Sequence, residues 1–292
     1  MHPIITAQIH LDSLQNGSSK PQIFADENLN QWVVKSAHSF QGPYNGRLLF
    51  NEYVATRIAE TIGMPVLKVA AISISPGILS AYPFLTNPNF GAFSPGLHFA
   101  ISYKPGYPLA QFVQSGQLQL VQSNTTNKIE ANSIMAFDTW TCNVDRAVDY
   151  PGPIHHENHG NLFFETIVPG MYRMIMIDHG IVFTGDWHDD PNKNPIHRIG
   201  YWALALMGHL DVFFKNQWAD LSQCLHWVQG IQSLTLVDLQ TIVSEVPLPW
   251  KAGISQIEID ALLACLLARA HQVGTVITQG FPQAQHFALA RP

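Results

Sequence analysis

The sequence predicts an α+β protein with a small, mixed, β-rich N-lobe near residues 1–106 and a larger, mostly helical C-lobe near residues 107–292. Two observations predict this fold class. Short runs of β-branched and aromatic residues dominate the first part, and helix-like segments occupy the chain from Ile199 onward. The Pro/Gly-containing stretch from Lys104 to Pro108 is typical of a connector, so we place the boundary there.

The N-lobe is expected to fold in the order strand, loop, strand, helix, strand, strand. The helix is predicted because Val54, Ile58 and Ile62 recur at every fourth position, and Gly63 and Pro65 then supply a stop signal. A polar segment separates the first two strands and is read as a loop. The predicted strands and helix are, in order, "PIITAQIHL", "QWVVKSA", "RLLFNEYVATRIAETIG", "VLKVAAISIS" and "HFAISY".

The C-lobe is expected to begin with a helix, continue with a β-hairpin and end in several helices. The first helix is "NKIEANSIMAFDTWTCN", and the hairpin joins "NLFFETI" to "YRMIMIDHGIVF" through "VPGM". The later helix-like segments are "IGYWALALMGHLDVFF", "LSQCLHWVQGIQSL", "LVDLQTIVSEV" and "EIDALLACLLARAHQVGTVI".

The composition indicates a globular protein with a large core. Hydrophobic residues make up 47% of the 292 residues, and charged residues make up 12%, against a usual share of roughly 25%. The formal net charge is −6, and the 15 Lys and Arg residues form no basic stripe. Because a protein that binds a nucleic-acid backbone needs such a stripe, we expect no direct nucleic-acid partner.

Cysteine usage and hydropathy predict a cytoplasmic location. Cys142, Cys224 and Cys265 are odd in number and far apart, which favours a reducing compartment over a disulfide framework. The N-terminal sequence lacks a basic region followed by an apolar run, so no signal peptide is predicted. No run of about 18 apolar residues is present, so we expect no membrane span.

Lys35 and Glu52 are the first candidate functional residues. Lys35 lies in the otherwise apolar strand "QWVVKSA", where a buried ammonium group needs an anionic partner. Glu52 lies early in the following helix and is able to supply that partner. The alternative is a lysine at a strand edge whose head group stays in water, together with a solvated helix glutamate.

The stretch "FDTWTCNVDR" places Asn143, Asp145 and Arg146 at the exit of a predicted buried helix. An apolar wall behind Asp145 would hold its carboxylate rigidly, which suits a group that orients a hydroxyl or accepts its proton. The alternative is an ordinary loop after a helix, in which Asn and Asp are common turn residues.

Asn161 and Asp178 form the third candidate. Asn161 directly precedes one strand of the predicted hairpin, and Asp178 follows the other strand. An amide and a carboxylate brought together across a hairpin make an oxygen-rich site, which suits Mg²⁺ that bridges phosphates. The alternative is a pair of turn residues. The order of these features along the chain favours a kinase-type phosphotransferase. That order is a strand with Lys, a helix with Glu, a connector, a helix, an Asp, an Asn before a strand and an Asp after a strand.

Several segments together resemble the HipA-like kinase family, whose members are bacterial relatives of the HipA toxin kinases in the protein-kinase-like superfamily. The segments are "WVVKSA", "NGRLLFNEYVATRIAETIGMPV", "GLHFAISY", "AFDTWTCNVDR", "GNLFF" and "MIDHGIVF". The resemblance runs from about Gln31 to Phe183. It implies a protein-kinase-like two-lobe fold and an ATP-dependent, Mg²⁺-requiring phosphotransferase that acts on a Ser or Thr hydroxyl of a protein partner.

The resemblance also implies roles for individual residues. Lys35 would be the lysine that binds the ATP phosphates, and Glu52 would be its partner on the helix. Asp145 would be the catalytic aspartate, and Asn161 and Asp178 would be the metal ligands.

The resemblance implies further candidates around these residues. Asn143 stands with Asp145 in the catalytic stretch. The backbone around Tyr103 and Lys104 would lie near the adenine as a hinge. No clean glycine-rich loop is present, and Gly17 and Ser18 in "QNGSSK" are the best candidates for a phosphate loop.

The sequence departs from the family pattern at two places. The metal-binding Asn usually follows the "DR" after a few residues, but here "AVDYPGPIHHENHG" precedes Asn161. Either this loop is expanded, or Asp149 or Asn158 takes the metal role. The last motif is "DHG" instead of "DFG", so we expect His179 to lack the apolar anchor that a Phe provides.

Two other functions stay open. The first is a metal-dependent hydrolase, because His155, His156 and His159 crowd one loop and His188 lies among further carboxylates. Against it, "HHENH" is not "HExxH", and a Pro/Gly loop is a poor platform for a rigid site. The second is a catalytically weak kinase fold that serves as a binding module. The sequence does not identify the acceptor substrate, the oligomeric state or a regulatory partner.

Overall fold

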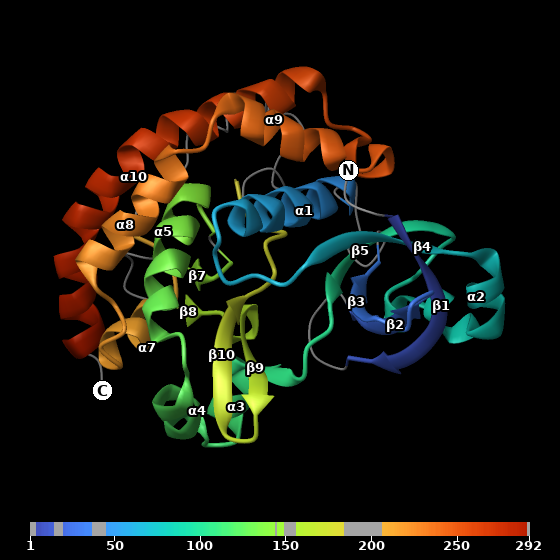
Figure 1. Ribbon diagram of the computed structural model, residues 1–292, viewed down its shortest axis with the longest axis horizontal. Coiled ribbons are helices and arrows are strands. Elements are labelled where there is room, and N and C mark those ends of the chain that lie inside the picture. The colour runs from blue at the N-terminus through green and yellow to red at the C-terminus, as the bar shows by residue number, and fades with distance from the viewer. Residues whose placement is uncertain are drawn as a thin grey trace.

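The computed structural model describes residues 4–14, 20–36, 45–143, 145–148, 156–183 and 206–290. Its N-terminal part is a closed five-stranded barrel in the order β1-β2-β3-β5-β4 (Figure 1). The β1–β4 pair is parallel, and the other neighbouring strands are antiparallel. The strands are β1 (Ile4–Ser13), β2 (Gln22–Asp26), β3 (Gln31–Lys35), β4 (Val69–Ile74) and β5 (Gly96–Ser102).

The barrel has a small apolar core of its own, which includes Phe24, Trp32 and Val34. Three short helical segments accompany it: α2 (Pro76–Ala81), η1 (Pro83–Thr86) and η2 (Pro88–Phe90). Strand β2 is an addition to the predicted order, because the sequence analysis placed it within a polar loop. All five of its residues are buried, including the polar Gln22 and Asp26 at its two ends.

Helix α1 (Asn45–Thr61) lies between the barrel and the helices of the C-terminal part (Figure 1). Tyr53, Val54 and Ile58 belong to the large apolar core that continues into the C-terminal part. The helix is buried on most of its circumference, so it carries no strong amphipathic pattern. Helix α1 therefore packs against both parts of the molecule.

The C-terminal part begins with a three-stranded sheet in the order β10-β9-β6. Strand β6 (Gly106–Pro108) follows β5 closely, and β9 (Leu162–Val168) and β10 (Met171–Met176) form the predicted hairpin. Gly106 has φ 155°, and a Cβ there would lie 2.2 Å from the backbone oxygen of Phe164, so only glycine fits this close strand contact.

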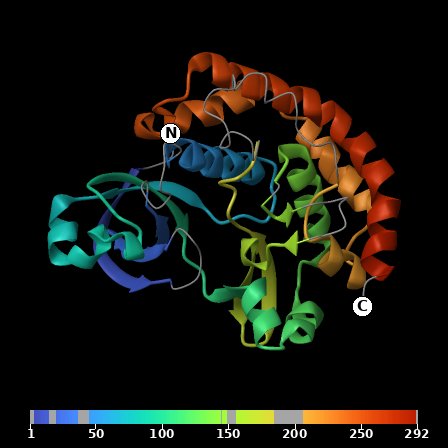
Figure 2. The same cartoon turned by 180° about the vertical axis from the view of Figure 1, so that it is seen from behind.

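The remaining described chain is mostly helical, although residues 206–209, which lie within the predicted helix "IGYWALALMGHLDVFF", are not helical. Helix α10 follows the outer edge of the molecule in both views (Figures 1 and 2). It packs against α5, α7 and α8. The helices are α3 (Leu109–Gln114), α4 (Leu118–Asn124), η3 (Lys128–Glu130), α5 (Ala131–Thr141), α7 (Leu210–Lys215), α8 (Leu221–Gln232), α9 (Leu236–Glu245), η6 (Leu248–Lys251) and α10 (Gln256–Ala290).

Helix α10 is long and apolar enough to cross a membrane, judged by length and composition alone. Its most apolar 18-residue window has a mean hydropathy of 1.4, and 39% of that window is buried inside the protein. A core helix of a protein passes the same test, and α10 packs against α5, α7, α8 and α9. The absence of a membrane span therefore stays a prediction.

The structure joins α5 to α10 by reciprocal hydrogen bonds. The indole Nε1 of Trp140 donates to the Leu266 carbonyl oxygen at 2.9 Å. In return, the Arg269 guanidinium donates to the carbonyl oxygens of Trp140 at 2.8 Å and Thr139 at 2.7 Å. Because the last carbonyls of a helix lack partners within it, Arg269 stabilises the end of α5. The chain that follows this end carries the candidate site.

Candidate active site

Lys35, Glu52 and Asp178 meet although they are far apart in the sequence; Lys35 and Glu52 are buried, and the Asp178 side chain is 37% exposed. The Nζ atom of Lys35, the last residue of β3, lies 3.1 Å from Oε2 of Glu52 and 2.9 Å from Oδ1 of Asp178. Glu52 lies on α1, and Asp178 lies just after β10. The predicted contact between Lys35 and Glu52 is present, and the structure adds Asp178 to it.

Burial and charge act against each other in this group. Burial opposes the charge of Lys35, but the two carboxylates outweigh it and raise the pKa of the ammonium above its ordinary value. Burial also opposes ionisation of Asp178, but Lys35 outweighs it and lowers the pKa of this carboxyl. Burial raises the pKa of Glu52 to about 7, and the nearby charge of Asp178 contributes to the rise. Asp178 is therefore the more acidic of the two carboxyls.

Asp145 is half-buried beyond the end of α5 and is held by two amides. The Nδ2 atom of Asn161 donates to its Oδ2 at 2.6 Å, and the Nδ2 atom of Asn158 donates to its Oδ1 at 3.4 Å. The hydrogen bond to Asn161 fixes the direction of the Asp145 carboxylate. The structure therefore brings together Asp145 and Asn161, which lie 16 positions apart in the sequence.

The long insertion after the "DR" begins and ends in a two-stranded hairpin of β7 (Ala147–Val148) and β8 (His156–Glu157). At its base, the Asn158 backbone N–H donates to the Arg146 carbonyl oxygen at 3.4 Å. The side-chain oxygen of Asn158 accepts from the Gly160 N–H at 3.1 Å and so caps the short helix η4 (His159–Asn161). This geometry favours the expanded-loop interpretation, with Asn161 beside Asp145. Asp149 lies outside the described residues.

A buried ion pair that the sequence analysis did not identify lies beneath these residues. The Arg146 Nε atom lies 2.7 Å from Asp138 Oδ2, and both side chains are fully buried. The Nη1 atom of Arg146 donates to the backbone oxygen of Asn161 and to that of Ile177, the latter at 3.3 Å. One guanidinium thus connects α5 to the residue that precedes β9 and to the residue that follows β10. The available signal was Asp138 itself, a lone acid within an apolar helix.

Asn143 lies within this buried network instead of beside the Asp145 carboxylate. Its side chain has no exposed surface, and its Nδ2 atom donates to Asp138 Oδ1 at 3.0 Å. Burial raises the pKa of Asp138 above its ordinary value, although Arg146 opposes that change. The structure therefore places Asn143 under the site, and a catalytic role by direct contact with a reactant has no support from this position.

His179 has apolar surroundings, so the expectation that it lacks an anchor is wrong. It is 1% exposed, and its ring packs edge-on against Phe137 with the ring centres 5.7 Å apart. Its Nδ1 atom lies 3.2 Å from the Thr56 hydroxyl. Burial holds the pKa of His179 well below its ordinary value, so the ring is neutral at pH 7. A neutral imidazole therefore fills the space expected for the Phe of a "DFG" motif.

The other predicted site residues have different outcomes. Gly17 and Ser18 lie outside the described residues. Tyr103 and Lys104 lie between β5 and β6, where the Tyr103 N–H donates to the Gln31 carbonyl oxygen at 2.9 Å and the Lys104 ammonium lies 3.9 Å from Glu165. Their proximity to an adenine stays a prediction.

Asn161 and Asp178 have the ligand chemistry for a hard divalent cation. Leu162 pairs with Met176, and the Ile177 N–H donates to the Asn161 carbonyl oxygen at 3.3 Å. The backbone beside Asn161 therefore lies next to the backbone that leads into Asp178. Because Asn161 uses its amide nitrogen on Asp145, its amide oxygen is left for a cation. An amide oxygen and a carboxylate are ligands that Mg²⁺ accepts, with water and phosphate completing the shell.

Within the part of the chain that the structure describes, no group of three or more His, Cys, Asp or Glu side chains is arranged to hold a metal ion. The histidine-rich alternative is not tested by this result. His155 and His188 lie outside the described residues, and the side chain of His156 is not described either.

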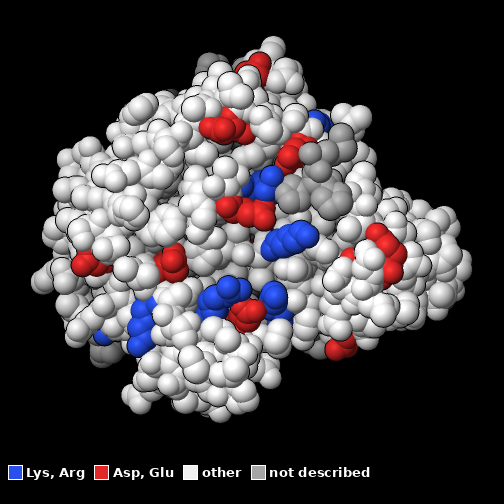
Figure 3. All heavy atoms as spheres, in the orientation of Figure 1, with Lys and Arg blue, Asp and Glu red and all other residues white. Residues whose placement is uncertain are grey.

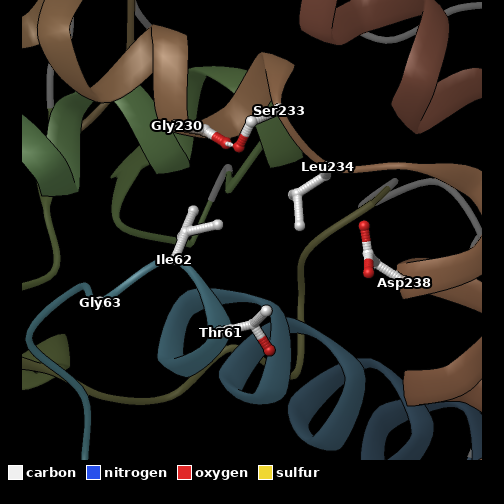
Figure 4. Close-up of a pocket in the computed structure, with 7 residues that line it drawn as sticks. All are labelled: Thr61, Ile62, Gly63, Gly230, Ser233, Leu234 and Asp238. Carbon is white, nitrogen blue, oxygen red and sulfur yellow. Dashed lines mark hydrogen bonds between the residues drawn. The ribbon is translucent and has the colours of Figure 1, made fainter.

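A hollow of about 500 Å³ lies away from the candidate site, at the C-terminal end of α1 (Figure 4). Its walls come from the end of α1, the end of α8 and the start of α9. The residues that line it are Thr61, Ile62, Gly63, Gly230, Ser233, Leu234 and Asp238. None of the predicted site residues lines this hollow, so we assign the candidate site by its ion pairs and hydrogen bonds instead.

Charged side chains are few on the face of the molecule shown in Figure 3. Acidic and basic groups lie side by side near the middle of this face, and most of the remaining surface is uncharged. Among the described ion pairs, Glu165 pairs with Arg173 at 2.6 Å and lies 3.9 Å from Lys104.

Comparison with solved structures shows the fold. The proinflammatory kinase CtkA of Helicobacter pylori is 14% identical, with a TM-score of 0.53, and the match covers 95% of this chain and 99% of CtkA. At this identity the similarity shows a kinase-like fold alone. No curated protein matches the chain in sequence.

Two other structures are similar at TM-scores below 0.5 and carry no weight for the fold. HipA of Shewanella oneidensis MR-1, solved with HipB and operator DNA, has a TM-score of 0.46 and is 14% identical, over 92% of this chain and 65% of HipA. The Golgi casein kinase with bound Mn/ADP has a TM-score of 0.44 and is 11% identical, over 94% of this chain and 74% of that protein.

The family assignment comes from the sequence. The family model described as HipA-like kinase matches residues 8–266. This range contains each residue of the ion-pair group and of the Asp145–Asn161 pair, and it extends past the residues that carry the predicted resemblance. The chain belongs to the HipA-like kinase family.

Proposed function

We propose that the protein is an ATP-dependent phosphotransferase that transfers a phosphoryl group to a Ser or Thr hydroxyl of a protein substrate. The observation that carries the proposal is the position of Lys35, whose Nζ atom lies between Glu52 and Asp178. The two acids lie 17 and 143 positions away in the sequence. In phosphotransferases a lysine held this way stabilises phosphate charge next to a metal-binding aspartate.

Each of the five site residues would have a role in phosphoryl transfer. Lys35 would contact the phosphates, and Glu52 would hold its ammonium in place. Asp145, whose carboxylate is fixed by Asn161, would orient the acceptor hydroxyl or accept its proton. Asn161 and Asp178 would hold Mg²⁺ through oxygen atoms. Bound Mg²⁺ and ATP would supply the phosphoryl group and neutralise its charge.

The buried network beneath the site would act by position. Asp138, Asn143 and Arg146 do not reach the surface, so they would contact no substrate. Because Arg146 holds the backbone at Asn161 and Ile177, the network fixes the distance between the groups that would bind metal and the group that would orient the acceptor. We therefore propose Asn143 as a positioning residue.

The proposal also covers the acceptor, the partners and the cellular location of the enzyme. We propose a protein as the acceptor, with no direct nucleic-acid partner, and a cytoplasmic location. The family membership supports kinase chemistry. The acceptor class, the location and the choice of Mg²⁺ over another divalent ion come from the sequence resemblance and the oxygen ligands.

Phosphoryl transfer from labelled ATP to the protein itself and to a mixed protein substrate tests the proposal. Asp145→Asn should lower turnover by about 10²- to 10⁴-fold, the usual contribution of general acid–base catalysis. Asp178→Asn should also lower turnover and should raise the Mg²⁺ concentration that half-maximal turnover requires. The matched control is Asp260→Asn, which changes an exposed acid on α10.

The results separate the candidate functions. Loss of turnover in both site variants, with the control unchanged, supports the phosphotransferase. Nucleotide binding without any turnover in the unaltered protein would favour the binding module. A hydrolytic activity that depends on His155 or His188, and not on Asp145, would favour the metal-dependent hydrolase.

A further inference from the structure

The outer face of α1 is covered by a segment from near the end of the chain. Helix α9 and the short helix η6 lie along α1 in Figures 1 and 2, and we call Leu236–Lys251 the α9–η6 segment. It comes from the C-terminal part, yet it contacts the helix that carries Glu52. Two of its side chains make the contacts that matter, Trp250 and Glu245.

Trp250 lies against the neighbours of both members of the Lys35–Glu52 pair. Its ring centre is 5.9 Å from that of Tyr53, which follows Glu52 in α1, and 6.4 Å from that of Phe99. Phe99 is the residue of β5 that pairs directly with Lys35 of β3.

Trp250 also makes a polar contact. It is 1% exposed, and its Nε1 atom donates to the carbonyl oxygen of Leu97 on β5 at 3.2 Å. One side chain therefore connects α1 to the strand next to β3. Movement of α1 away from the barrel would break this aromatic packing.

Glu245 makes the second contact, one helical turn further along α1. Its Oε2 atom accepts from Arg57 Nε at 3.2 Å and from Arg57 Nη2 at 3.1 Å. Both side chains are mostly buried, with 13% and 16% exposure. Arg57 also pairs with Glu60 of its own helix, so it links a carboxylate on α1 to one on the α9–η6 segment.

We propose that the α9–η6 segment is a built-in positioning element for catalysis, in which Trp250 and Glu245 hold α1 where Glu52 meets Lys35. A buried lysine is stable only while its partners stay close, so the pair needs a rigid α1. In kinases, the position of this helix decides whether the lysine and glutamate meet. Here the holding contacts come from the same chain, so the pair forms without a second protein. The effect on turnover rests on the proposed function.

The first test measures the pair directly and needs no catalysis. Acylation of Lys35 by an amine-reactive reagent is followed by mass spectrometry in the unaltered protein and in Trp250→Leu, Trp250→Phe and Glu245→Gln. We expect Lys35 to react about tenfold faster in Trp250→Leu, with smaller increases in the other two. Circular dichroism and the thermal midpoint identify any variant that fails to fold, and the milder Trp250→Phe then serves in its place.

Two matched controls separate the segment from general packing. Glu60→Gln removes the other carboxylate partner of Arg57 but leaves the α9–η6 segment in contact, so Lys35 should react as in the unaltered protein. Leu248→Ala changes an 80% exposed residue of η6 and should also have no effect. Folded Trp250 and Glu245 variants in which Lys35 stays protected would overturn the proposal, as would an equal increase in the Glu60 variant.

The second test asks whether the segment acts through Glu52. Glu245→Gln should lower kcat/KM for phosphoryl transfer about threefold to tenfold in the normal background and have almost no further effect in a Glu52→Gln background. A fully additive effect in both backgrounds would show a structural role only and would overturn the proposal. Absence of phosphoryl transfer in the unaltered protein would defeat the proposed function, but the Lys35 labelling result would still decide the role of the segment.

Discussion

Arg146 is fully buried beside Asp138, and its guanidinium also reaches the carbonyl oxygens of Asn161 and Ile177. A buried ion pair does not by itself stabilise a fold, because both charges lose their hydration. It becomes costly to disturb once formed, because removal of one charge leaves the other without compensation. The pair therefore fixes one arrangement of the chain around the candidate site.

Replacing Asp138 by Asn should destabilise the protein by about 3 to 5 kcal/mol, because Arg146 is then a buried charge without a counterion. Urea unfolding followed by circular dichroism measures the change. The double variant Asp138→Leu/Arg146→Met removes both charges and should recover part of the loss. A decrease of less than about 1 kcal/mol for Asp138→Asn would contradict a role of the pair in stability.

His179 offers a second prediction at this scale. The ring is neutral, buried and packed against Phe137, and its polar contact described here is with the Thr56 hydroxyl. His179→Phe replaces the imidazole with another aromatic ring that is able to pack against Phe137, so we expect it to change the free energy of unfolding by less than about 1.5 kcal/mol. Thermal unfolding measures this. A larger loss would show that the contact with Thr56 is required.

Among the secondary-structure elements, the β2–β3 hairpin of the barrel depends on Asp26. Its carboxylate accepts from Trp32 Nε1 at 2.9 Å and from the backbone N–H groups of Asn28 and Asn30 at 2.8 and 2.9 Å. Burial opposes ionisation of Asp26, but these hydrogen bonds outweigh it and lower its pKa below the ordinary value. The ionised carboxylate thus holds the turn between the two strands.

This pKa shift predicts a pH dependence of stability. The folded-state pKa of Asp26 lies below that of the unfolded chain, so its stabilisation is present above about pH 4 and is lost as the pH falls through the folded-state value. The difference in unfolding free energy between the unaltered protein and Asp26→Asn should therefore be largest near neutral pH and shrink under acid. A difference that is the same at pH 7 and pH 3 would contradict this account.

The elements that were predicted have a local sequence pattern, whereas those that were missed depend on contacts that form only in the folded chain. Helix α1 and the β9–β10 hairpin were predicted because apolar spacing and turn residues lie within each segment. Strand β2 was missed because Gln22 and Asp26 make "QIFAD" look polar, and the barrel buries both ends. Asp138 was missed as a component of the site because only the folded chain brings it into contact with Arg146.

At the scale of the whole molecule, the candidate site joins residues from most of the chain. The order of motifs predicted that Lys35, Glu52, Asp145, Asn161 and Asp178 belong together, and the structure shows the contacts within each half of this set. Helix α9 was predicted, but its contact with α1 was not, because Glu245 lies 188 positions from Arg57 and neither residue has a local pattern that indicates the contact.

Ligand binding should be visible in the stability of the whole protein. A ligand that binds the folded state at a hundred times its Kd stabilises it by about 2.7 kcal/mol. We expect Mg²⁺ with a non-hydrolysable ATP analogue to raise the Tm, and the Mg²⁺-dependent part of the rise to disappear in Asp178→Ala. Calorimetry measures both. A rise that is the same with and without Mg²⁺ would contradict the assignment of Asp178 as a metal ligand.

The β7–β8 hairpin has a consequence for how relatives of this protein are recognised. Because the backbones of Arg146 and Asn158 meet at its base, the number of residues between them has no effect on where Asn161 sits relative to Asp145. Pattern searches that demand a short, fixed gap between an acid and its following asparagine would pass over such chains. A search for homologues should allow any number of residues in that gap, provided that the two ends of the inserted segment pair with each other.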